Sequence, residues 1–477
     1  MGAIFLRLAA MIDSDMADRA YTTKEEVVSI ADGALHKTLR QLIPADRVEA
    51  VLKKAAEYGT NRKGYFGDLI EEYIFGVSNN GRAEADFTMA GIELKSTPLR
   101  RHKAKKYVAK ERLVFSMIDY EKIVNERWET SSFLEKNKLL LIMFYLYLDK
   151  EQNLLDYEFE FVHLLNLLED ISAQDVEQIR KDWQFIVDKI RSGKAHLLSE
   201  GDTFYLGACT KARNSLVIRN QPMSDIPAKP RAFSLKQSYL NNLIQRNLLG
   251  IQSDAESIYE GEKPEMTIEE VVEHRFSPYI GKTESEIMTT LGWNTQARPK
   301  NLKRLLVNRI LTGTGSNKVE EFEKADITLR VVTLEPDGAL RESISFPAFD
   351  YKDLITQVWE DDANEYMSDF HTELETNRFL FVVFQKTPAG GVVLKGTKFW
   401  NFPASDLKEA QKVFEKTITC IKEERYDGLP KMTENPVAHV RPHARDGKDT
   451  QETPQGTFQI KRSFWLNAKY IQGILSN

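Results

Sequence analysis

The sequence predicts an α/β protein made of two tandem copies of one domain, each with a mixed central sheet flanked by helices. The first observation is an internal repeat: FSMIDY at 115–120, followed by WE at 128–129, recurs 231 residues later as FPAFDY and WE. The same offset relates RAFSLKQSYL at 231–240 to RSFWLNAKYI at 462–471. One offset shared by two separated blocks indicates a duplication.

Within each expected copy, helical patterns come first and strand patterns follow. Apolar residues at helical spacing predict helices at 22–42, 67–76, 266–282 and 301–311. Strands are expected at 91–97, 138–148, 204–208 and 378–385. The stretch KLLLIMFYLYL at 138–148 is too apolar for a strand with one exposed face, so it predicts a central strand covered on both sides.

The chain has 477 residues, which is long for a single hydrophobic core. We expect a first domain at 1–245 and a second at 266–477. The linker between them, 246–265, contains the polar stretch QSDAESIYEGEKPE.

Composition excludes several classes of protein. Hydrophobic residues make up 42% and charged residues 29%, which is typical of a soluble globular chain and not of a disordered or fibrous one. Cys209 and Cys420 form no CxxC or zinc-type spacing, so we expect no disulfide framework and a reducing, cytoplasmic location. No segment reaches the ~18 uninterrupted apolar residues of a membrane span, so no membrane partner is expected.

Net charge is −6, which argues against a protein that only binds polyanions. Two local runs are nevertheless basic: 95–112 has eight Lys or Arg against one acid, and 298–309 has five against none. Most such runs are solvated surface, but beside other signals they become candidates for phosphate-binding faces.

The stretch ADFTMAGIELKST at 85–97 carries the candidate chemistry. Residues two apart in a strand share a face, so Glu93 and Lys95 are expected on one side while Ile92 and Leu94 point into the core. Asp86 would supply a second carboxylate. Hard divalent cations such as Mg²⁺ take oxygen ligands and activate a bound water, and a nearby lysine offsets charge in the transition state.

The spacing of acid and lysine alone is weak evidence. The same pattern occurs at Asp350-Lys352, Asp406-Lys408 and Asp446-Lys448. Taken by itself, the stretch therefore favours the exposed edge of a strand with alternating charge over a catalytic site.

The surrounding blocks carry a family resemblance. NRKGYFGDLIEEYIFG at 61–76, EADFTMAGIELKSTP at 84–98, WETS at 128–131 and KPRAFSLKQSYLNNL at 229–243 occur in one order. Together they resemble the MutH family, which comprises a mismatch-repair nicking endonuclease and the Sau-type restriction endonucleases that cut at GATC. The resemblance implies a restriction-endonuclease-like fold of the PD-(D/E)xK class in each copy.

The resemblance also implies roles for individual residues. By position, Glu71, Asp86, Glu93 and Lys95 match the catalytic residues, with the three carboxylates as metal ligands and Glu71 favoured over Glu72. Lysines expected near the scissile phosphate and the DNA backbone are Lys63, Lys136 and Lys138. The segments 206–213 and 231–236 fall where the family reads bases, which nominates Lys211, Arg231, Ser234 and Lys236. The nicking member has Arg-Pro-Lys where this chain has Cys209-Thr210-Lys211, so which residues read the bases stays open.

The second copy is expected to be inactive. Aligning 84–96 with 319–331 places Glu321 at the position of Asp86, Thr328 at that of Glu93 and Arg330 at that of Lys95, and Glu71 corresponds to Val307. Thr and Val offer no carboxylate, and Arg stays protonated. HVRPHAR at 439–445 keeps an Arg-Pro-basic pattern, so Arg441, His443 and Arg462 are nominated as DNA contacts of this copy.

The function implied is a type II, IIE-like restriction endonuclease that cleaves double-stranded DNA at GATC by Mg²⁺-dependent hydrolysis. Its second copy would bind another GATC site as an effector, and the protein would be a monomer that dimerises on DNA. The alternatives are a MutH-like repair nickase and a non-catalytic GATC-binding protein.

Overall fold

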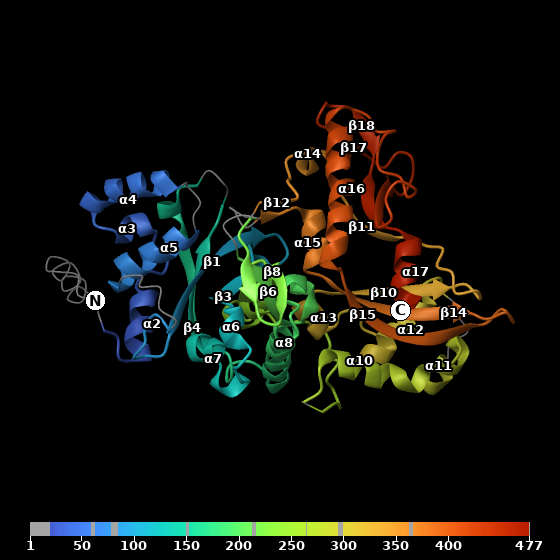
Figure 1. The fold of residues 1–477 in the computed structure, drawn as a ribbon, viewed down its shortest axis with the longest axis horizontal. Coiled ribbons are helices and arrows are strands. Elements are labelled where there is room, and N and C mark those ends of the chain that lie inside the picture. Colours follow the sequence, from blue (N-terminus) through green and yellow to red (C-terminus); the bar gives the residue numbers. More distant parts are fainter. Residues whose placement is uncertain are drawn as a thin grey trace. The chain divides into compact units, whose positions relative to one another are not determined.

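The computed structural model describes residues 20–58, 63–77, 84–148, 152–211, 216–263, 265–293, 299–361 and 366–476 (Figure 1). Its contacts divide the chain into two compact units. The first comprises Met1–Val176 and Ser234–Gln252, and the second comprises Glu177–Phe233 and Ser253–Asn477. The segment Glu177–Phe233, which the repeat assigns to the first copy, thus makes most of its contacts with the C-terminal half.

The first unit opens with helices. They are α2 (Lys24–Asp32), α3 (Leu39–Leu42), α4 (Ala45–Tyr58), α5 (Lys63–Ile70) and the π-helical turn η1 (Glu71–Phe75). The prediction of a single helical region over 22–42 is wrong, because the structure has two separate helices there, α2 and α3. Residues 33–38 form a turn and a bridge instead, because Thr38 starts a new helix with its own capping box. The helix predicted at 67–76 begins earlier, at Lys63, and ends where Gly76 adopts a φ of 66°.

A four-stranded sheet forms the centre of the first unit. The order is β2 (Lys106–Ala109), β1 (Glu93–His102), β4 (Leu139–Leu146) and β5 (Glu158–Asn166), with β1 and β4 parallel and the other pairs antiparallel. All residues of β4 are buried, which confirms the predicted central strand. Helices α2 to α5 lie along one side of this sheet, where Phe66 packs against Tyr145 (Figure 1).

Shorter elements complete the first unit. They are β3 (Leu113–Met117), α6 (Tyr120–Ile123), η2 (Trp128–Thr130), α7 (Ser132–Asn137), η3 (Leu154–Asp156), α9 (Gln237–Leu243) and η6 (Ile244–Leu248). Helix α8 (Ala173–Arg191) and strand β9 (Arg231–Leu235) pass from one unit to the other.

The second unit contains a sheet with order β10 (Ile327–Leu334), β14 (Arg378–Lys386) and β15 (Val392–Asn401), and a second with order β11 (Ile344–Ala348), β19 (Arg462–Leu466) and β16 (Ala438–Pro442). Helices α10 (Ile268–Phe276), α11 (Glu284–Thr290) and α12 (Leu302–Thr312) lie along the first sheet (Figure 1). Its other helices are η4 (Ala195–Leu197), η5 (Glu200–Asp202), η7 (Ser277–Tyr279), α13 (Glu320–Ala325), α14 (Tyr351–Leu354), α15 (Asp369–Glu375), α16 (Ala404–Lys422) and α17 (Ala468–Ser476). The remaining strands are β6 (Leu206–Thr210), β7 (Arg219–Gln221), β8 (Ser224–Ala228), β12 (Glu360–Asp361), β13 (Tyr366–Met367), β17 (Thr450–Glu452) and β18 (Phe458–Ile460).

The predicted elements of the second unit are mostly found. The helix predicted at 301–311 is α12 and the strand at 378–385 is β14. The strand predicted at 204–208 starts two residues later, and the helix at 266–282 stops at Phe276 before a short 3-10 turn that contains Pro278. The polar stretch expected to be a linker packs into this unit, because Ile258 is fully buried and its amide donates to Glu321.

The strand pairing of the two units follows one pattern. Strands β1 and β10 each pair in parallel with a buried strand that pairs antiparallel with a third. Glu93 lies opposite Leu140, the second residue of β4, and Thr328 lies opposite Phe379, the second residue of β14. The positions that the sequence alignment pairs therefore occupy the same place in their two sheets.

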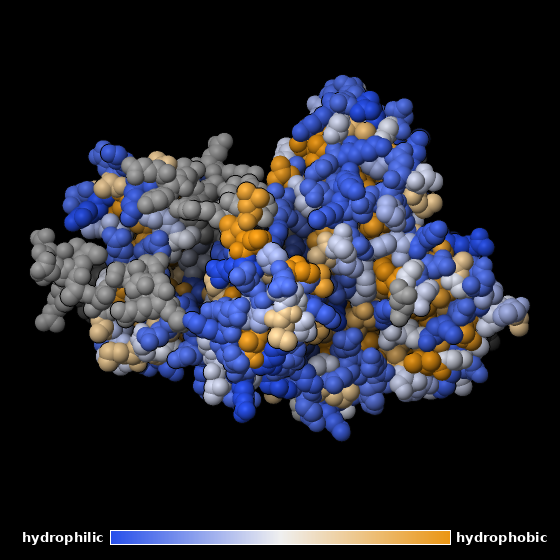
Figure 2. All heavy atoms as spheres, in the orientation of Figure 1, coloured by the Kyte–Doolittle hydropathy of each residue, from blue (hydrophilic) through white to orange (hydrophobic). Residues whose placement is uncertain are grey.

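Hydrophilic residues cover most of the face shown in Figure 2. Among the helices of the described residues, none is long and apolar enough to cross a membrane.

Candidate active site

Strand β1 begins with the predicted pair. Ile92 and Leu94 are buried in the core, as the alternation predicts, and Glu93 is itself only 3% exposed. Lys95 Nζ donates to Glu93 Oε1 at 2.7 Å and to the carbonyl of Phe115, on β3, at 2.8 Å. The exposed-edge interpretation is therefore wrong for this pair, because a solvated strand edge would leave both charges in water.

A tight turn brings Asp86 to the start of β1. The amide of Phe87 donates to the carbonyl of Ile92 at 2.9 Å, and Gly91 between them has a φ of 66°, which glycine adopts without strain. Asp86 Oδ2 accepts a hydrogen bond from the amide of Leu94 at 2.9 Å. The carboxylate is thereby held beside the strand that carries Glu93 and Lys95.

Glu71 comes from the helical layer. It is the first residue of the π-helical turn that ends α5, a kind of irregularity common at functional sites. Burial raises the pKa of Glu71 to about 7, and the negative charges of Asp86, Asp68 and Glu93 add to the effect. The three predicted carboxylates therefore lie close enough to repel one another.

Asp68 was missed by the sequence reasoning. It lies three residues before Glu71 on α5 and helps to raise the pKa of that carboxyl. The spacing of three residues, which places two side chains on one face of a helix, was the available signal.

Lys136, on α7, completes the charge arrangement around Glu93. Its Nζ lies 3.7 Å from Glu93 Oε1, so two lysines face one carboxylate oxygen. The pKa of Glu93 is raised by burial, which the charges of Lys95 and Lys136 partly oppose. Glu93 Oε2 is buried and accepts no hydrogen bond from the described residues.

These groups have the right chemistry for a hard divalent cation. The donor set consists of carboxylate oxygens, one of which is buried without a partner in the described chain, and a cation would relieve the repulsion between them. Among the described residues, however, no group of three or more His, Cys, Asp or Glu side chains is arranged to hold a metal ion. The role of Glu71, Asp86 and Glu93 as metal ligands therefore stays a prediction.

The other lysines and the base-reading residues predicted in the first copy differ in their exposure to solvent. Lys138 is exposed at the end of α7, Lys211 follows β6 half-buried, and the side chain of Lys63 lies outside the described residues. Ser234 and Lys236 are buried, at 0% and 2% exposure, so neither presents a group to solvent in this structure. Their DNA-binding roles stay predictions.

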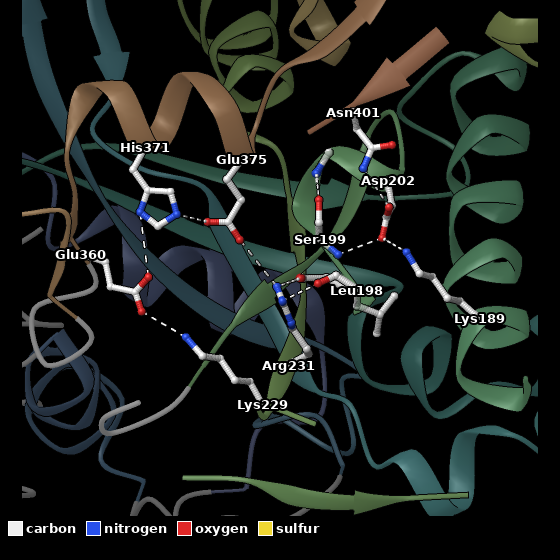
Figure 3. A network of polar contacts seen from close by, with 12 residues as sticks. Lys189, Leu198, Ser199, Asp202, Lys229, Arg231, Glu360, His371, Glu375 and Asn401 are labelled. Carbon is white, nitrogen blue, oxygen red and sulfur yellow. Dashed lines mark hydrogen bonds and ion pairs between the residues drawn. The ribbon is translucent and has the colours of Figure 1, made fainter. Parts of the chain in front are cut away.

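Arg231 is buried, and its guanidinium binds groups in the interior of the second unit. It donates to the carbonyls of Ala208 and Leu198 and lies 3.8 Å from Glu375 of α15. Figure 3 shows the network that follows: Glu375 pairs with His371 at 3.2 Å, His371 faces Glu360 at 3.9 Å, and Glu360 pairs with Lys229 at 3.1 Å. These polar contacts link the segment 177–233 to the C-terminal half.

The positions in the second unit that correspond to the candidate active site hold no comparable pair among the described residues. Glu321 is buried and accepts hydrogen bonds from Ser257 Oγ at 2.5 Å and the amide of Ile258 at 3.0 Å. Val307 lies in the core, and Arg330 donates to the carbonyl of Ser345 at 3.3 Å.

The three DNA contacts nominated in the second copy come from β16, the residues just after it and the paired strand β19. Pro442 pairs with Arg462 in the strand register, and the guanidinium of Arg441 lies 4.5 Å from the ring centre of Trp465. The ring of His443 is 5.5 Å from the same indole. Sequence reasoning missed Trp465, since only the pairing of β16 with β19 brings it close to these two side chains.

A buried carboxylate paired with lysine stands at the start of a parallel-paired strand in this α/β domain, with further carboxylates from a turn and a helix, and metal-assisted hydrolysis uses groups of these kinds. The family model described as "DNA mismatch repair enzyme MutH" matches residues 75–182, which include this strand.

Whole-length comparison extends the match. The chain is 31% identical over 500 aligned positions to the type II restriction enzyme Sau3AI of Staphylococcus aureus, covering 95% of this chain and 98% of that protein. It is 28% identical to the DNA mismatch repair protein MutH of Pasteurella multocida and 26% identical to that of Shigella flexneri serotype 5b, each over 39% of this chain. These matches cover 82% and 79% of the two MutH proteins.

The chain therefore belongs to the family of the type II restriction enzyme Sau3AI. It is a site-specific deoxyribonuclease with a MutH-like domain in its N-terminal half.

Proposed function

We propose that the protein cleaves double-stranded DNA at GATC by Mg²⁺-dependent hydrolysis, and that its C-terminal half binds a second GATC site as an effector. We place it in the cytoplasm as a monomer that dimerises on DNA. The observation that carries the proposal is the cluster on β1, where Glu93 is buried between Lys95 at 2.7 Å and Lys136 at 3.7 Å.

Glu93, Asp86 and Glu71 would hold the cation. A bound divalent ion lowers the pKa of its water and polarises a phosphoryl oxygen. Lys95, oriented by the carbonyl of Phe115, supplies a fixed positive charge where negative charge develops on the phosphate. Lys136 approaches the same carboxylate from α7 and adds a second cation.

The effector role depends on the C-terminal half being a second, degenerate copy. Three observations support this: the repeat at one offset, the same parallel pairing of β1 with β4 and of β10 with β14, and the equal place of Glu93 and Thr328 in that pairing. The copy would keep a DNA surface around Arg441 and Trp465 while lacking the carboxylates that cleavage needs. Effector action requires that binding at this surface changes the affinity or rate at the first site.

A MutH-like nickase is the second candidate, because the MutH family model matches the segment with Glu93 and Lys95. The two MutH proteins match 39% of the chain, however, and the relative that spans 95% of it is a restriction enzyme. A protein that only binds GATC is disfavoured by the intact residues Glu71, Asp86, Glu93 and Lys95.

Digestion of plasmids with no, one or two GATC sites tests the proposal, with Mg²⁺ or EDTA present. We expect cleavage of both strands that needs Mg²⁺ and at least one site, and that is accelerated by a second GATC duplex added in trans. The Lys95→Ala variant should lose cleavage while still binding GATC duplexes. Unchanged cleavage by that variant would overturn the site assignment, nicking of one strand would favour the repair enzyme, and a rate indifferent to the second duplex would refute the effector role.

A further inference from the structure

The second unit has lost two of the three predicted carboxylates of the first unit and carries two arginines at positions corresponding to the candidate active site. If Glu71 corresponds to Val307, the same alignment of α5 with α12 places Arg304 at the position of Asp68. Arg330 takes the position of Lys95, and Thr328 that of Glu93. A group of side chains rich in carboxylates in the first unit thus becomes a cationic one in the second.

Arg304 and Arg330 approach the same part of strand β10. Arg304, on α12, donates from Nη1 to the carbonyl of Leu329 at 3.0 Å, and Leu329 directly precedes Arg330. Arg330 Nη2 donates to the carbonyl of Ser345 at 3.3 Å, while its Nε is buried and reaches no acceptor among the described residues. Each guanidinium has five N–H donors, so these bonds leave donors available to a further acceptor.

The two guanidinium groups also repel each other. The pKa of Arg304 is held below its usual range by burial and by the charge of Arg330. Glu373 is near enough to Arg330 to raise the pKa of that guanidinium in part, although burial dominates and lowers it. Both arginines stay protonated at neutral pH, so an anion placed between them would relieve the repulsion.

Lys303 extends the cationic surface along the same strand. It precedes Arg304 on α12 and donates to Thr333 Oγ1 on β10 at 2.8 Å. Two cations from one helix therefore reach β10, and Arg330 adds a third from the strand itself.

We propose that Arg304 and Arg330 form a metal-free binding site for a phosphodiester group of the DNA backbone, in the duplex that the C-terminal half holds. The inference rests on the proposed effector function and deepens it. Guanidinium groups bind phosphate oxygens through paired hydrogen bonds, so two of them replace the bridging role that a divalent cation has in a nuclease site. The second site would bind DNA in the absence of any metal.

Titration of the full chain with a labelled GATC duplex in EDTA tests the site. Wild-type protein should bind two duplexes per chain. The double variant R304L/R330M removes both charges while keeping apolar bulk, and it should bind the second duplex at least tenfold more weakly. The slope of log affinity against log salt concentration should also become shallower, by about one for each phosphate that the variant no longer neutralises.

Controls separate charge from folding. Arg330→Lys keeps the charge and should lose less affinity than Arg330→Met, and Lys412→Ala removes an exposed cation of α16 that pairs with Glu409. That control should bind as the wild type does. A duplex with one uncharged methylphosphonate, moved along the strand, should weaken wild-type binding at one position and leave R304L/R330M unaffected there.

The outcomes are distinguishable. If wild-type protein binds a single duplex both in EDTA and with Ca²⁺ present, the effector function itself fails. If it binds two and R304L/R330M binds both with unchanged affinity and salt slope, the effector function stands and the arginine site is overturned. A second duplex that binds only when a divalent cation is present would also overturn it.

Discussion

Strands β1 and β10 pair with their parallel neighbours in the same register, yet the side chains around their first residues differ in charge. Around β1, the carboxylates of Glu71, Asp86 and Glu93 crowd together with Lys95. Around β10, Val307 is buried, Thr328 has no charge and Arg330 lies near Arg304. The backbone arrangement is thus independent of the chemistry placed on it, because hydrophobic packing and strand pairing hold it in both units.

The starts of strands β6 and β16, both within the second unit, also differ in the side chain that holds them. The amides of Phe204, Tyr205 and Leu206 donate to the buried carboxylate of Asp182 on α8, at 3.1, 2.6 and 3.0 Å. The amides of Val437 and Ala438, at the start of β16, donate to the side chain of Asn435 at 2.9 and 3.0 Å. A distant carboxylate holds one strand, and a local amide holds the other.

Replacing Glu93, the first residue of β1, by the threonine that its counterpart Thr328 carries should have the largest effect, which is on the cleavage rate. Glu93→Thr removes the buried carboxylate, so single-turnover cleavage of a GATC duplex should fall by roughly a thousandfold or more while DNA binding survives. Glu72→Gln changes the same charge one residue away from Glu71 and should stay near wild type. If Glu93→Thr cleaved as fast as the wild type, the carboxylate at this position of β1 would not be required for cleavage.

Removing the Asp182 carboxylate, which accepts hydrogen bonds at the start of β6, should have the next largest effect. Asp182→Ala leaves three buried amides without their acceptor, so the free energy of unfolding of the second unit should fall by about 2–4 kcal/mol. Asn435→Ala, which frees two amides, should cost about 1–2 kcal/mol. Denaturant unfolding measures both, with Asp188→Ala on the exposed face of α8 as the control. If both variants lost the same free energy of unfolding, the two side chains would contribute equally to holding their strands.

Lys136 should matter less than Glu93. Lys136→Ala leaves Lys95 in place beside Glu93 but removes one of two cations, so the cleavage rate should fall by roughly 10- to 100-fold. Lys138→Ala removes an exposed lysine two residues further along and should change the rate less than Lys136→Ala. Single-turnover rates at saturating enzyme measure this difference. Equal rates for the two variants would show that Lys136 has no special role in cleavage.

The smallest expected effect is a gain in stability. The pKa of Glu71 is about 7 in the folded protein, above its ordinary value of 4.5, so the unfolded chain releases this proton at lower pH than the folded chain. Stability is therefore lost between pH 4.5 and 7 as pH rises. In metal-free buffer, Glu71→Gln should recover about 1–2 kcal/mol at about pH 8, discounted for partial exposure, and nothing at about pH 4.

Thermal unfolding at the two pH values in EDTA measures this gain, with Glu72→Gln as the matched control. A gain that is the same at both pH values would show that burial and the neighbouring carboxylates do not raise the pKa of Glu71. Cleavage should be lost in Glu71→Gln, since the carboxylate that destabilises the fold is the one proposed to bind the metal.

Features that depend on local periodicity could be predicted from the sequence. The apolar run of β4 marked a central strand, the alternation around Glu93 and Lys95 placed them away from the core residues Ile92 and Leu94, and α12 and β14 were found within a residue of their bounds. The alignment of 84–96 with 319–331 paired Glu93 with Thr328, and strand register places both at the same point of their sheets.

Which distant groups meet could be learned from the folded chain alone. The fold enclosed Arg231 in a network with Glu375 and brought Trp465 close to both Arg441 and His443. It also assigned the segment 177–233 to the contacts of the C-terminal half. Periodicity reports how a side chain faces its own helix or strand, whereas burial and charge pairing depend on elements that the chain brings together from far apart.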